Sequence, residues 1–199
     1  MNSPEEIATW RKAERTRLVE GRMALSSAER EAATTRIAEH LEALIGEPAG
    51  VVISAYWPFR GEPDLKPLLK RFQAAGAITA LPMVVKKHHP LAFRAWKSGD
   101  RLERGVWNIP FPAEGREVIP DVTIAPVVGF DSSCFRLGYG GGFFDRTIAA
   151  LPSMPRFFGV GYSIQEIPTI HPQRHDIPMY AVCTEAGIVR PACRCSRSS

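Results

Sequence analysis

Apolar side chains recur at helical spacing over the first 45 residues. Ile7, Trp10 and Leu18 mark one face of a first helix. Residues 26–29 (SSAE) have the form of a capping box, and apolar positions at helical spacing continue from there to Ile45. The N-terminal region therefore predicts two consecutive helices.

Short apolar runs alternate with amphipathic segments after residue 50. Runs rich in β-branched and aromatic residues predict buried strands at 51–57, 77–85, 91–96, 122–128 and 157–162. Helices are predicted at 65–72 and 143–151, and the prolines of 105–120 predict a loop-rich connection. This alternation predicts a three-layer α/β/α domain, Rossmann-like, with a mostly parallel central sheet and additional N-terminal helices. Ligands are expected at the carboxyl ends of its strands.

Composition is that of an ordinary globular protein, with 199 residues, 45% hydrophobic and 23% charged. We expect one domain over residues 1–190, followed by a basic, disordered tail at 191–199. No apolar run is long enough to cross a membrane and no signal peptide is recognisable, so we expect a cytoplasmic protein with no membrane partner. The cysteines, too few for a disulfide framework, are expected to be reduced: Cys134, Cys183, Cys193 and Cys195. A formal net charge of +4 favours anionic ligands without singling out nucleic acid.

The most informative segment spans residues 129–146 and holds the run RLGYGGGFFDR at 136–146. It follows a predicted strand and opens a predicted helix, so its glycines let the backbone approach an anion at the helix N-terminus. It is neither a P-loop, which needs Lys-Ser or Lys-Thr, nor a dinucleotide fingerprint, because Phe143 stands at the last glycine position. A turn that only joins a strand to a helix is the alternative.

Two charged residues beside the glycines favour phosphate chemistry. Arg136 offers a planar guanidinium that suits phosphate oxygens. Asp145 lies in the first turn of the predicted helix, where a carboxylate can hold Mg²⁺. Complementing the helix dipole is the simpler role for Asp145.

Residues 136–146, preceded by Gly129-Phe130-Asp131, resemble the signature of the 5-formyltetrahydrofolate cyclo-ligase family, also called 5,10-methenyltetrahydrofolate synthetases. Other segments follow in that family's order, and the resemblance covers roughly residues 8 to 190. These segments are 56–69, Leu81-Pro82, 107–110, His175-Asp176 and 184–189.

The resemblance implies an ATP- and Mg²⁺-dependent ring closure of 5-formyltetrahydrofolate to 5,10-methenyltetrahydrofolate, with release of ADP and phosphate. The formyl oxygen would be phosphorylated and the activated carbon then attacked by N10. Such a reaction needs positioning and charge neutralisation rather than a protein nucleophile. We expect a monomer or weak dimer.

The resemblance also implies roles for individual residues. Arg136 and Asp145 are expected to be catalytic, and Asp145 and Asp176 to hold Mg²⁺. The substrate-binding residues are expected to be Tyr56, Trp57, Glu62 and Trp107. The ATP-binding residues are expected to be Arg11, Lys12, Arg15, Arg136, Leu137, Gly138, Tyr139, Gly140, Gly141, Gly142, Phe143 and Phe144.

Two other functions stay open at this point. Phe143 and Phe144 stand where the family commonly has tyrosines, and Tyr180 stands where the family often has an aspartate after the His-Asp pair. These departures allow a divergent paralogue that binds ATP and acts on another metabolite. Aromatic residues beside basic ones would also suit a nucleic-acid-binding module, although that function leaves the ordered glycine run unexplained. His171 and His175 lack a third ligand for a zinc site.

Overall fold

The structure is a computed structural model that describes residues 3–191, except for the side chain of Trp107. The helices are α1 (Pro4–Ala24), α2 (Ser27–Ile45), α3 (Lys66–Ala74) and α4 (Phe143–Ala150), with short 3-10 helices η1 (Val106–Asn108) and η2 (Ser163–Gln165). The strands are β1 (Val52–Ser54), β2 (Ile78–Met83), β3 (Ala92–Ala95), β4 (Leu102–Arg104), β5 (Pro110–Pro112), β6 (Val122–Pro126), β7 (Gly129–Phe130), β8 (Arg136–Leu137), β9 (Arg156–Val160), β10 (Ala181–Thr184) and β11 (Gly187–Val189).

The main sheet has seven strands in the order β11-β10-β9-β6-β1-β2-β3. Neighbours from β10 to β2 run parallel, whereas the edge strands β3 and β11 are antiparallel to their partners. β6 pairs with β9 from Val122 opposite Arg156 to Pro126 opposite Val160. The prediction of a mostly parallel sheet is confirmed.

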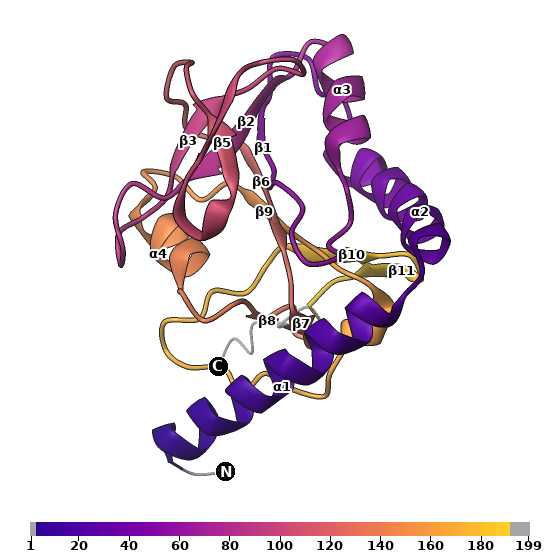
Figure 1. Ribbon diagram of the computed structural model, residues 1–199, viewed down its shortest axis with the longest axis vertical. Helices are drawn as coiled ribbons and strands as arrows, with labels where there is room; N and C mark the ends of the chain where they lie inside the picture. The colour runs from indigo at the N-terminus through magenta and orange to yellow at the C-terminus, as the bar shows by residue number, and fades with distance from the viewer. Residues whose placement is uncertain (1–2, 192–199) are drawn as a thin grey trace, which may run out of the picture.

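Helices cover both faces of this sheet, as Figure 1 shows with α2 and α3 on one side and α4 on the other. Along β6, Val122 and Ile124 join the cluster under α2 and α3, whereas Ala125 joins the cluster under α4. This alternation follows from the two-residue period of a strand. The three-layer prediction is confirmed.

The N-terminal helices begin as predicted. α2 starts at the capping box of Ser26 and Glu29, and α1 starts at a second capping box of Ser3 and Glu6. α2 lies on the sheet, whereas α1 runs along the lower end of the molecule in Figure 1 and packs Leu18 against the loops that follow β6. α1 is therefore placed to reach the loops at the carboxyl ends of the strands.

Two predictions about strands were wrong in extent. The apolar run 51–57 forms a strand only over Val52–Ser54, and the residues after Ala55, whose amide still bonds the carbonyl of Ala80, leave the sheet for the cavity wall. The connection predicted as loop-rich at 105–120 contains strand β5, which pairs with β4 and contacts β2 and β3. In both places tertiary pairing overrides the local pattern.

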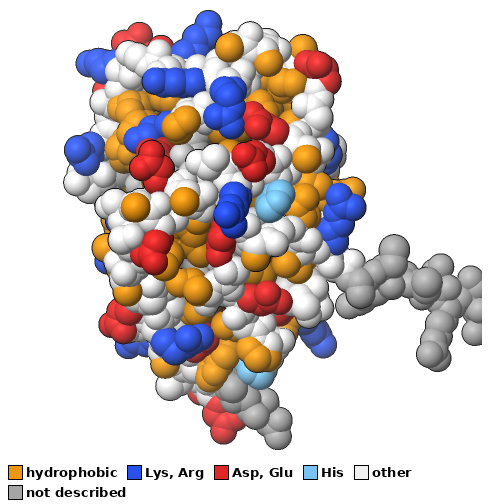
Figure 2. Space-filling model, turned by 90° about the vertical axis from the view of Figure 1, so that its right-hand side faces the viewer, with side chains coloured by type: hydrophobic (Ala, Val, Ile, Leu, Met, Phe, Trp, Pro, Cys, Tyr) orange, Lys and Arg blue, Asp and Glu red, His pale blue; other side chains and the backbone are white. Residues whose placement is uncertain are grey.

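Charges of both signs are mixed on the surface. Figure 2 shows Lys and Arg side chains interspersed with Asp and Glu over the face that is on the right in Figure 1, where α2 and α3 lie. Among residues 3–191, no helix is both long and apolar enough to cross a membrane. The predicted basic tail, apart from Pro191, lies outside the described residues.

Candidate active site

A cavity of about 440 Å³ opens where β1, β2 and β6 end. Tyr56 follows β1, Met83 ends β2 and Pro126 ends β6, and all three line it. The glycine-rich loop 138–142 and α1 close one side, and the 3-10 helix η1 with β5 closes another. The cavity thus lies at the carboxyl edge of the sheet, where the fold class predicts a ligand.

Two residues of the glycine-rich loop adopt a backbone conformation that favours glycine. Gly140 and Gly142 have φ of 93° and 62°, in the left-handed region. A Cβ on Gly142 would lie 2.9 Å from Nη1 of Arg146, and one on Gly140 would lie 3.4 Å from Cζ of Arg15. Gly142 is also the residue that caps α4, so the loop leads directly into that helix's N-terminus.

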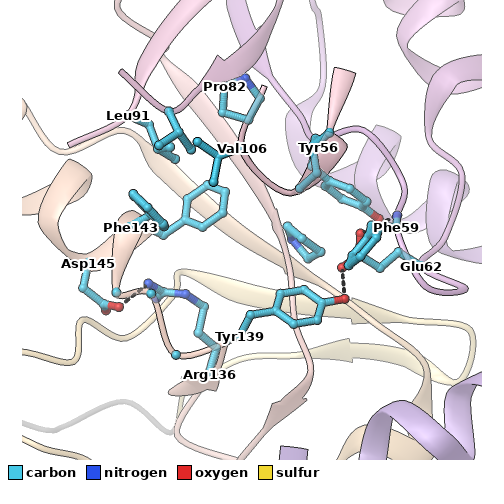
Figure 3. A pocket seen from close by; sticks show the side chains of 18 of the residues that line it. Tyr56, Phe59, Glu62, Pro82, Leu91, Val106, Arg136, Tyr139, Phe143 and Asp145 are labelled. Carbon is cyan, nitrogen blue, oxygen red and sulfur yellow. Dashed lines mark hydrogen bonds and ion pairs between the residues drawn. The ribbon is translucent and has the colours of Figure 1, made fainter. Parts of the chain in front are cut away.

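Arg136 and Asp145 form an ion pair at the base of the loop, with 2.8 Å between Nη2 and Oδ2 (Figure 3). Arg136 also donates to the carbonyl of Ile177 and lies over the rings of Phe144 and Phe157. Asp145 accepts from the amide of Ile177. Burial lowers the pKa of Arg136, and the neighbouring Asp145 opposes that shift.

A second ion pair joins Arg11 of α1 to Asp176, with 2.6 Å between Nη2 and Oδ2. Arg11 also donates to the carbonyls of Ile170 and His171, which fixes its guanidinium beside the cavity. Asp176 accepts in addition from the amide of Gln173. Each carboxylate predicted to hold metal therefore has an arginine and a backbone amide as partners.

Arg15 lies one turn along α1 from Arg11 and also lines the cavity. Its Nε donates to the carbonyl of Gly138 at 2.7 Å, and burial lowers its pKa. Lys12 is different, because it is exposed and does not line the cavity. Adjacent residues of a helix are rotated by about 100°, so Arg11 and Lys12 cannot face the same loop.

Glu62 lies in the opposite wall and is 6% exposed. Its Oε2 accepts from the amide of Phe59 at 2.9 Å, and its Oε1 accepts from the Tyr139 hydroxyl at 2.9 Å. Burial raises the pKa of Glu62 to about 7, although Arg22 and these hydrogen bonds oppose the shift. This wall therefore holds a carboxyl group that is close to half ionised at neutral pH.

Two predicted aromatic residues border the cavity. The ring of Tyr56 is buried, and its hydroxyl donates to the carbonyl of Pro63. Trp57 meets Trp96 edge to face and carries the ammonium of Lys66 over its ring at 4.8 Å. The third predicted aromatic, Trp107, has its side chain outside the described part of the chain.

The three apolar residues predicted to bind ATP differ in which part of the residue faces the cavity. Leu137 is 1% exposed and packs with Leu18, so its backbone is the part available to a ligand. Phe144 stacks on Phe157, whereas Phe143 points toward Leu91 and Val106 in Figure 3. The structure thus brings the residues predicted for ATP into one wall, except Lys12.

Sequence reasoning missed two groups of site residues. Arg22 is fully buried, and nothing in a polar helix marks one arginine as buried. The structure also adds an apolar wall, of which Pro82, Met83 and Leu91 come from predicted strands. It consists of Phe59, Pro82, Met83, Leu91, Val106 and Phe111.

The donor set suits a loosely held magnesium ion better than a closed metal site. Among residues 3–191 no group of three or more His, Cys, Asp or Glu side chains is placed to hold a metal. Asp145 and Asp176 both line the cavity, and Mg²⁺ commonly takes one or two carboxylates together with phosphate oxygens and waters. The two residues therefore fit an ion that takes most of its ligands from elsewhere than this protein.

Of the cysteines and histidines within residues 3–191, His175 alone lines the cavity. Cys134 and Cys183 are unpaired, and burial raises their pKa values to about 11 and about 12. His171 packs edge to face against Trp10. Cys193 and Cys195 lie outside the described residues.

A parallel α/β sheet with a glycine-rich loop and arginines at its carboxyl edge is typical of proteins that bind phosphate-bearing ligands. Comparison with known proteins agrees with this class and narrows it. The chain belongs to the 5-formyltetrahydrofolate cyclo-ligase family, whose model matches residues 7–185.

Individual relatives support the same assignment. A 5-formyltetrahydrofolate cyclo-ligase of Escherichia coli K12 is 31% identical over 149 residues, covering 68% of this chain and 79% of that protein. One of Haemophilus influenzae is 25% identical over 177 residues, covering 84% and 94%. The solved structure of Aquifex aeolicus 5,10-methenyltetrahydrofolate synthetase superposes with a TM-score of 0.79 at 28% identity, covering 95% of each chain. A Mycoplasma pneumoniae 5,10-methenyltetrahydrofolate synthetase, 21% identical with a TM-score of 0.73 over 88% of this chain and 98% of that one, shares the fold.

Proposed function

We propose that this chain uses ATP and Mg²⁺ to convert 5-formyltetrahydrofolate to 5,10-methenyltetrahydrofolate, with release of ADP and phosphate. One observation carries the proposal: the cavity has a glycine-rich loop with arginines in one wall and a buried acid in the other. The chain that forms this cavity belongs to the cyclo-ligase family. Phosphorylation of the formyl oxygen turns a poor leaving group into a good one, and N10 then closes the ring. We also expect a cytoplasmic monomer or weak dimer without a nucleic-acid partner.

The wall that contains the glycine-rich loop would bind the triphosphate. Arg136, Arg15 and Arg11 place three guanidinium groups along it, and the backbone of 138–142 and the start of α4 lie beside them. Asp145 and Asp176 would hold Mg²⁺, which neutralises phosphate charge when bound. The arginines then supply the remaining positive charge as the γ-phosphoryl group is transferred.

The opposite wall would bind the folate. Glu62 is placed to accept hydrogen bonds from the N–H groups of a pterin ring, and Tyr56, Trp57 and Trp107 would offer flat surfaces to it. The apolar wall of Phe59, Pro82, Met83, Leu91, Val106 and Phe111 would exclude water from the activated formyl group. Holding both substrates in one cavity would bring the formyl oxygen to the γ-phosphate.

Absorbance in the methenyltetrahydrofolate band tests this proposal directly. Purified protein, 5-formyltetrahydrofolate and Mg²⁺ are mixed with and without ATP, and absorbance is expected to rise only when ATP is present. Release of phosphate in a one-to-one ratio to methenyl product should accompany the rise. A folded sample that binds ATP and gives no rise would overturn the proposal and favour a paralogue with another substrate.

A further inference from the structure

Tyr139 belongs to the nucleotide-side loop by its backbone and to the opposite wall by its hydroxyl. It stands between Gly138, whose carbonyl accepts from Arg15 Nε at 2.7 Å, and Gly140, which lies against the same guanidinium. Its ring extends along the cavity, and Figure 3 shows it lying between Arg136 and Glu62. The hydroxyl donates to Oε1 of Glu62 at 2.9 Å. One side chain therefore connects the two walls.

Arg22 holds the hydroxyl from the other side. Its guanidinium is completely buried and donates to the carbonyl of Arg60, to the carbonyl of Val127 and, at 2.6 Å through Nη2, to the Tyr139 hydroxyl. The same Nη2 lies 3.9 Å from Oε1 of Glu62, beyond a direct hydrogen bond. The Tyr139 hydroxyl thus relays the contact between a buried cation and a buried acid.

We propose that Tyr139 is a positioning residue that couples the two substrate subsites, so that ligand on the glycine-rich loop holds the hydroxyl on Glu62 and thereby strengthens folate binding. This inference rests on the proposed function. The coupling is reciprocal by thermodynamic necessity, so folate strengthens nucleotide binding by the same factor.

The geometry explains why the coupling runs through this residue. A tyrosine ring is rigid and has two side-chain torsions, so a shift of the loop backbone carries the hydroxyl with it. A hydrogen bond of 2.9 Å is lost within less than 1 Å of such a shift. If the hydroxyl moves away, a buried guanidinium donor and a buried carboxylate oxygen both lose a partner, which is costly in a protein interior.

The charge state of Glu62 responds to the same contact. The groups that face it are Arg22 from α1, Tyr139 from the glycine-rich loop, Tyr56 from the end of β1 and the amide of Phe59. Arg22 and the Tyr139 hydroxyl both lower the pKa of Glu62 against the effect of burial. Removing the hydroxyl therefore raises that pKa further and reduces the ionised fraction at neutral pH.

Calorimetric titration of the full chain tests the coupling. The affinity for 5-formyltetrahydrofolate is measured with and without saturating Mg²⁺ and a nonhydrolysable ATP analogue. We expect the analogue to tighten folate binding about 10-fold in the wild type and by less than about 2-fold in Tyr139→Phe, which keeps the ring and removes the hydroxyl. Tyr180→Phe is the matched control, since Tyr180 is exposed and does not line the cavity, and it should keep the wild-type factor.

The pH dependence separates positioning from a structural role. In Tyr139→Phe the loss of folate affinity should be larger at pH 7 than at pH 8.5, because the ionised fraction of Glu62 rises with pH. A general distortion of the cavity would weaken folate equally at both pH values, and that result would contradict the inference.

The outcomes also separate this inference from the proposed function. If the wild type binds neither folate nor nucleotide, the proposed function fails and the inference fails with it. If the wild type binds both and Tyr139→Phe keeps the 10-fold factor, or if the wild type shows no coupling, the inference alone is overturned.

Discussion

The cavity's two walls hold their acidic side chains in contrasting ways. Beside the glycine-rich loop, Asp145 and Asp176 each face an arginine, with nitrogen to oxygen distances of 2.8 and 2.6 Å. In the opposite wall, Glu62 accepts from a hydroxyl and an amide, and the nearest guanidinium nitrogen is 3.9 Å away. Burial raises the pKa of Glu62 to about 7.

This difference shows how one residue type can serve two recognition tasks. Each ion pair balances the charge of its carboxylate until an anion and a cation arrive together, which suits a nucleotide with its metal. A desolvated carboxyl group whose ionised form is favoured by neighbouring donors suits recognition of the N–H groups of a heterocycle. Variants that act on one wall and spare the other sharpen this contrast.

Arg136→Gln should give the largest effect. It leaves Asp145 without its cation in a pair whose side chains are 4% and 18% exposed, so we expect a loss of stability of about 3 kcal/mol. Turnover should fall by about 100-fold or more, since a buried guanidinium at the base of the glycine-rich loop is lost. Denaturant unfolding and the absorbance assay measure the two effects.

Arg17→Gln serves as the control for Arg136→Gln. Arg17 pairs with Glu14 on α1, yet its side chain is 62% exposed. Its removal should change stability by no more than about 0.5 kcal/mol. Equal losses in the two variants would contradict the assignment of Arg136 to a buried functional pair.

Glu62→Gln should weaken folate binding roughly 10- to 100-fold at pH 8, because a charged acceptor is lost. Without folate present, the affinity for a nonhydrolysable ATP analogue should change less than about 3-fold, since the other wall is intact apart from Tyr139 and coupling between the subsites does not enter. Calorimetric titration of each ligand alone measures this split. A parallel loss for both ligands, each measured alone, would contradict separate roles for the two walls.

The same variant tests the raised pKa of Glu62 through stability. Below pH 4.5 the Glu62 carboxyl group is neutral in both the folded and the unfolded chain. Between pH 4.5 and about 7 this group has lost its proton in the unfolded chain and keeps it in the folded chain. Wild-type stability should therefore fall as pH rises through this window, by up to about 3 kcal/mol, and level off above it. Denaturant unfolding at pH 5 and pH 8 should show this decline in the wild type and not in Glu62→Gln.

Asp145→Asn should raise the Mg²⁺ concentration needed for half-maximal turnover by about 10-fold, because asparagine keeps an oxygen acceptor for the amide of Ile177 and loses the charge. Magnesium titration of turnover measures the change. Glu42→Gln, which alters the exposed pair with Arg71, is the control and should leave the titration unchanged. An unaltered magnesium requirement in Asp145→Asn would remove this residue from the proposed metal site.

The smallest expected effects compare two neighbours on α1. Arg15→Ala should weaken binding of a nonhydrolysable ATP analogue by about 5-fold, because the guanidinium lies on the loop at Gly138 and Gly140. Lys12→Ala should change it by less than about 2-fold, since Lys12 is exposed outside the cavity. Similar losses of affinity in both variants would show that Lys12 also contributes to nucleotide binding.

Much of the fold could be predicted because its signals are local. The capping box at Ser26, the β-branched runs and the glycines after Leu137 each reflect the preference of a short segment. The antiparallel pair β4–β5 escaped prediction because β4 is a short polar segment and β5 contains two prolines, so both have weak local propensity for a strand.

The site was predictable to the extent that its residues lie in recognisable motifs. Arg136, Asp145 and Glu62 all line the cavity as expected from their motifs. Arg22 could not be found, because an arginine in a polar helix carries no local sign that a loop 38 residues away will bury it. The exclusion of Lys12 likewise depends on which face of α1 meets the glycine-rich loop.

By itself, the sequence determined the order of the four helices and of strands β1, β2, β3, β6 and β9, the glycine-rich turn and the residue types of both walls, since these follow from local propensity and spacing. Only the tertiary structure decided that Arg136 pairs with Asp145, that Arg22 reaches Glu62 through Tyr139, and that burial raises the pKa of Glu62. The physical reason is distance along the chain. Residues 22, 62 and 139 meet only after the sheet has brought their loops to one edge, and desolvation depends on everything packed around them.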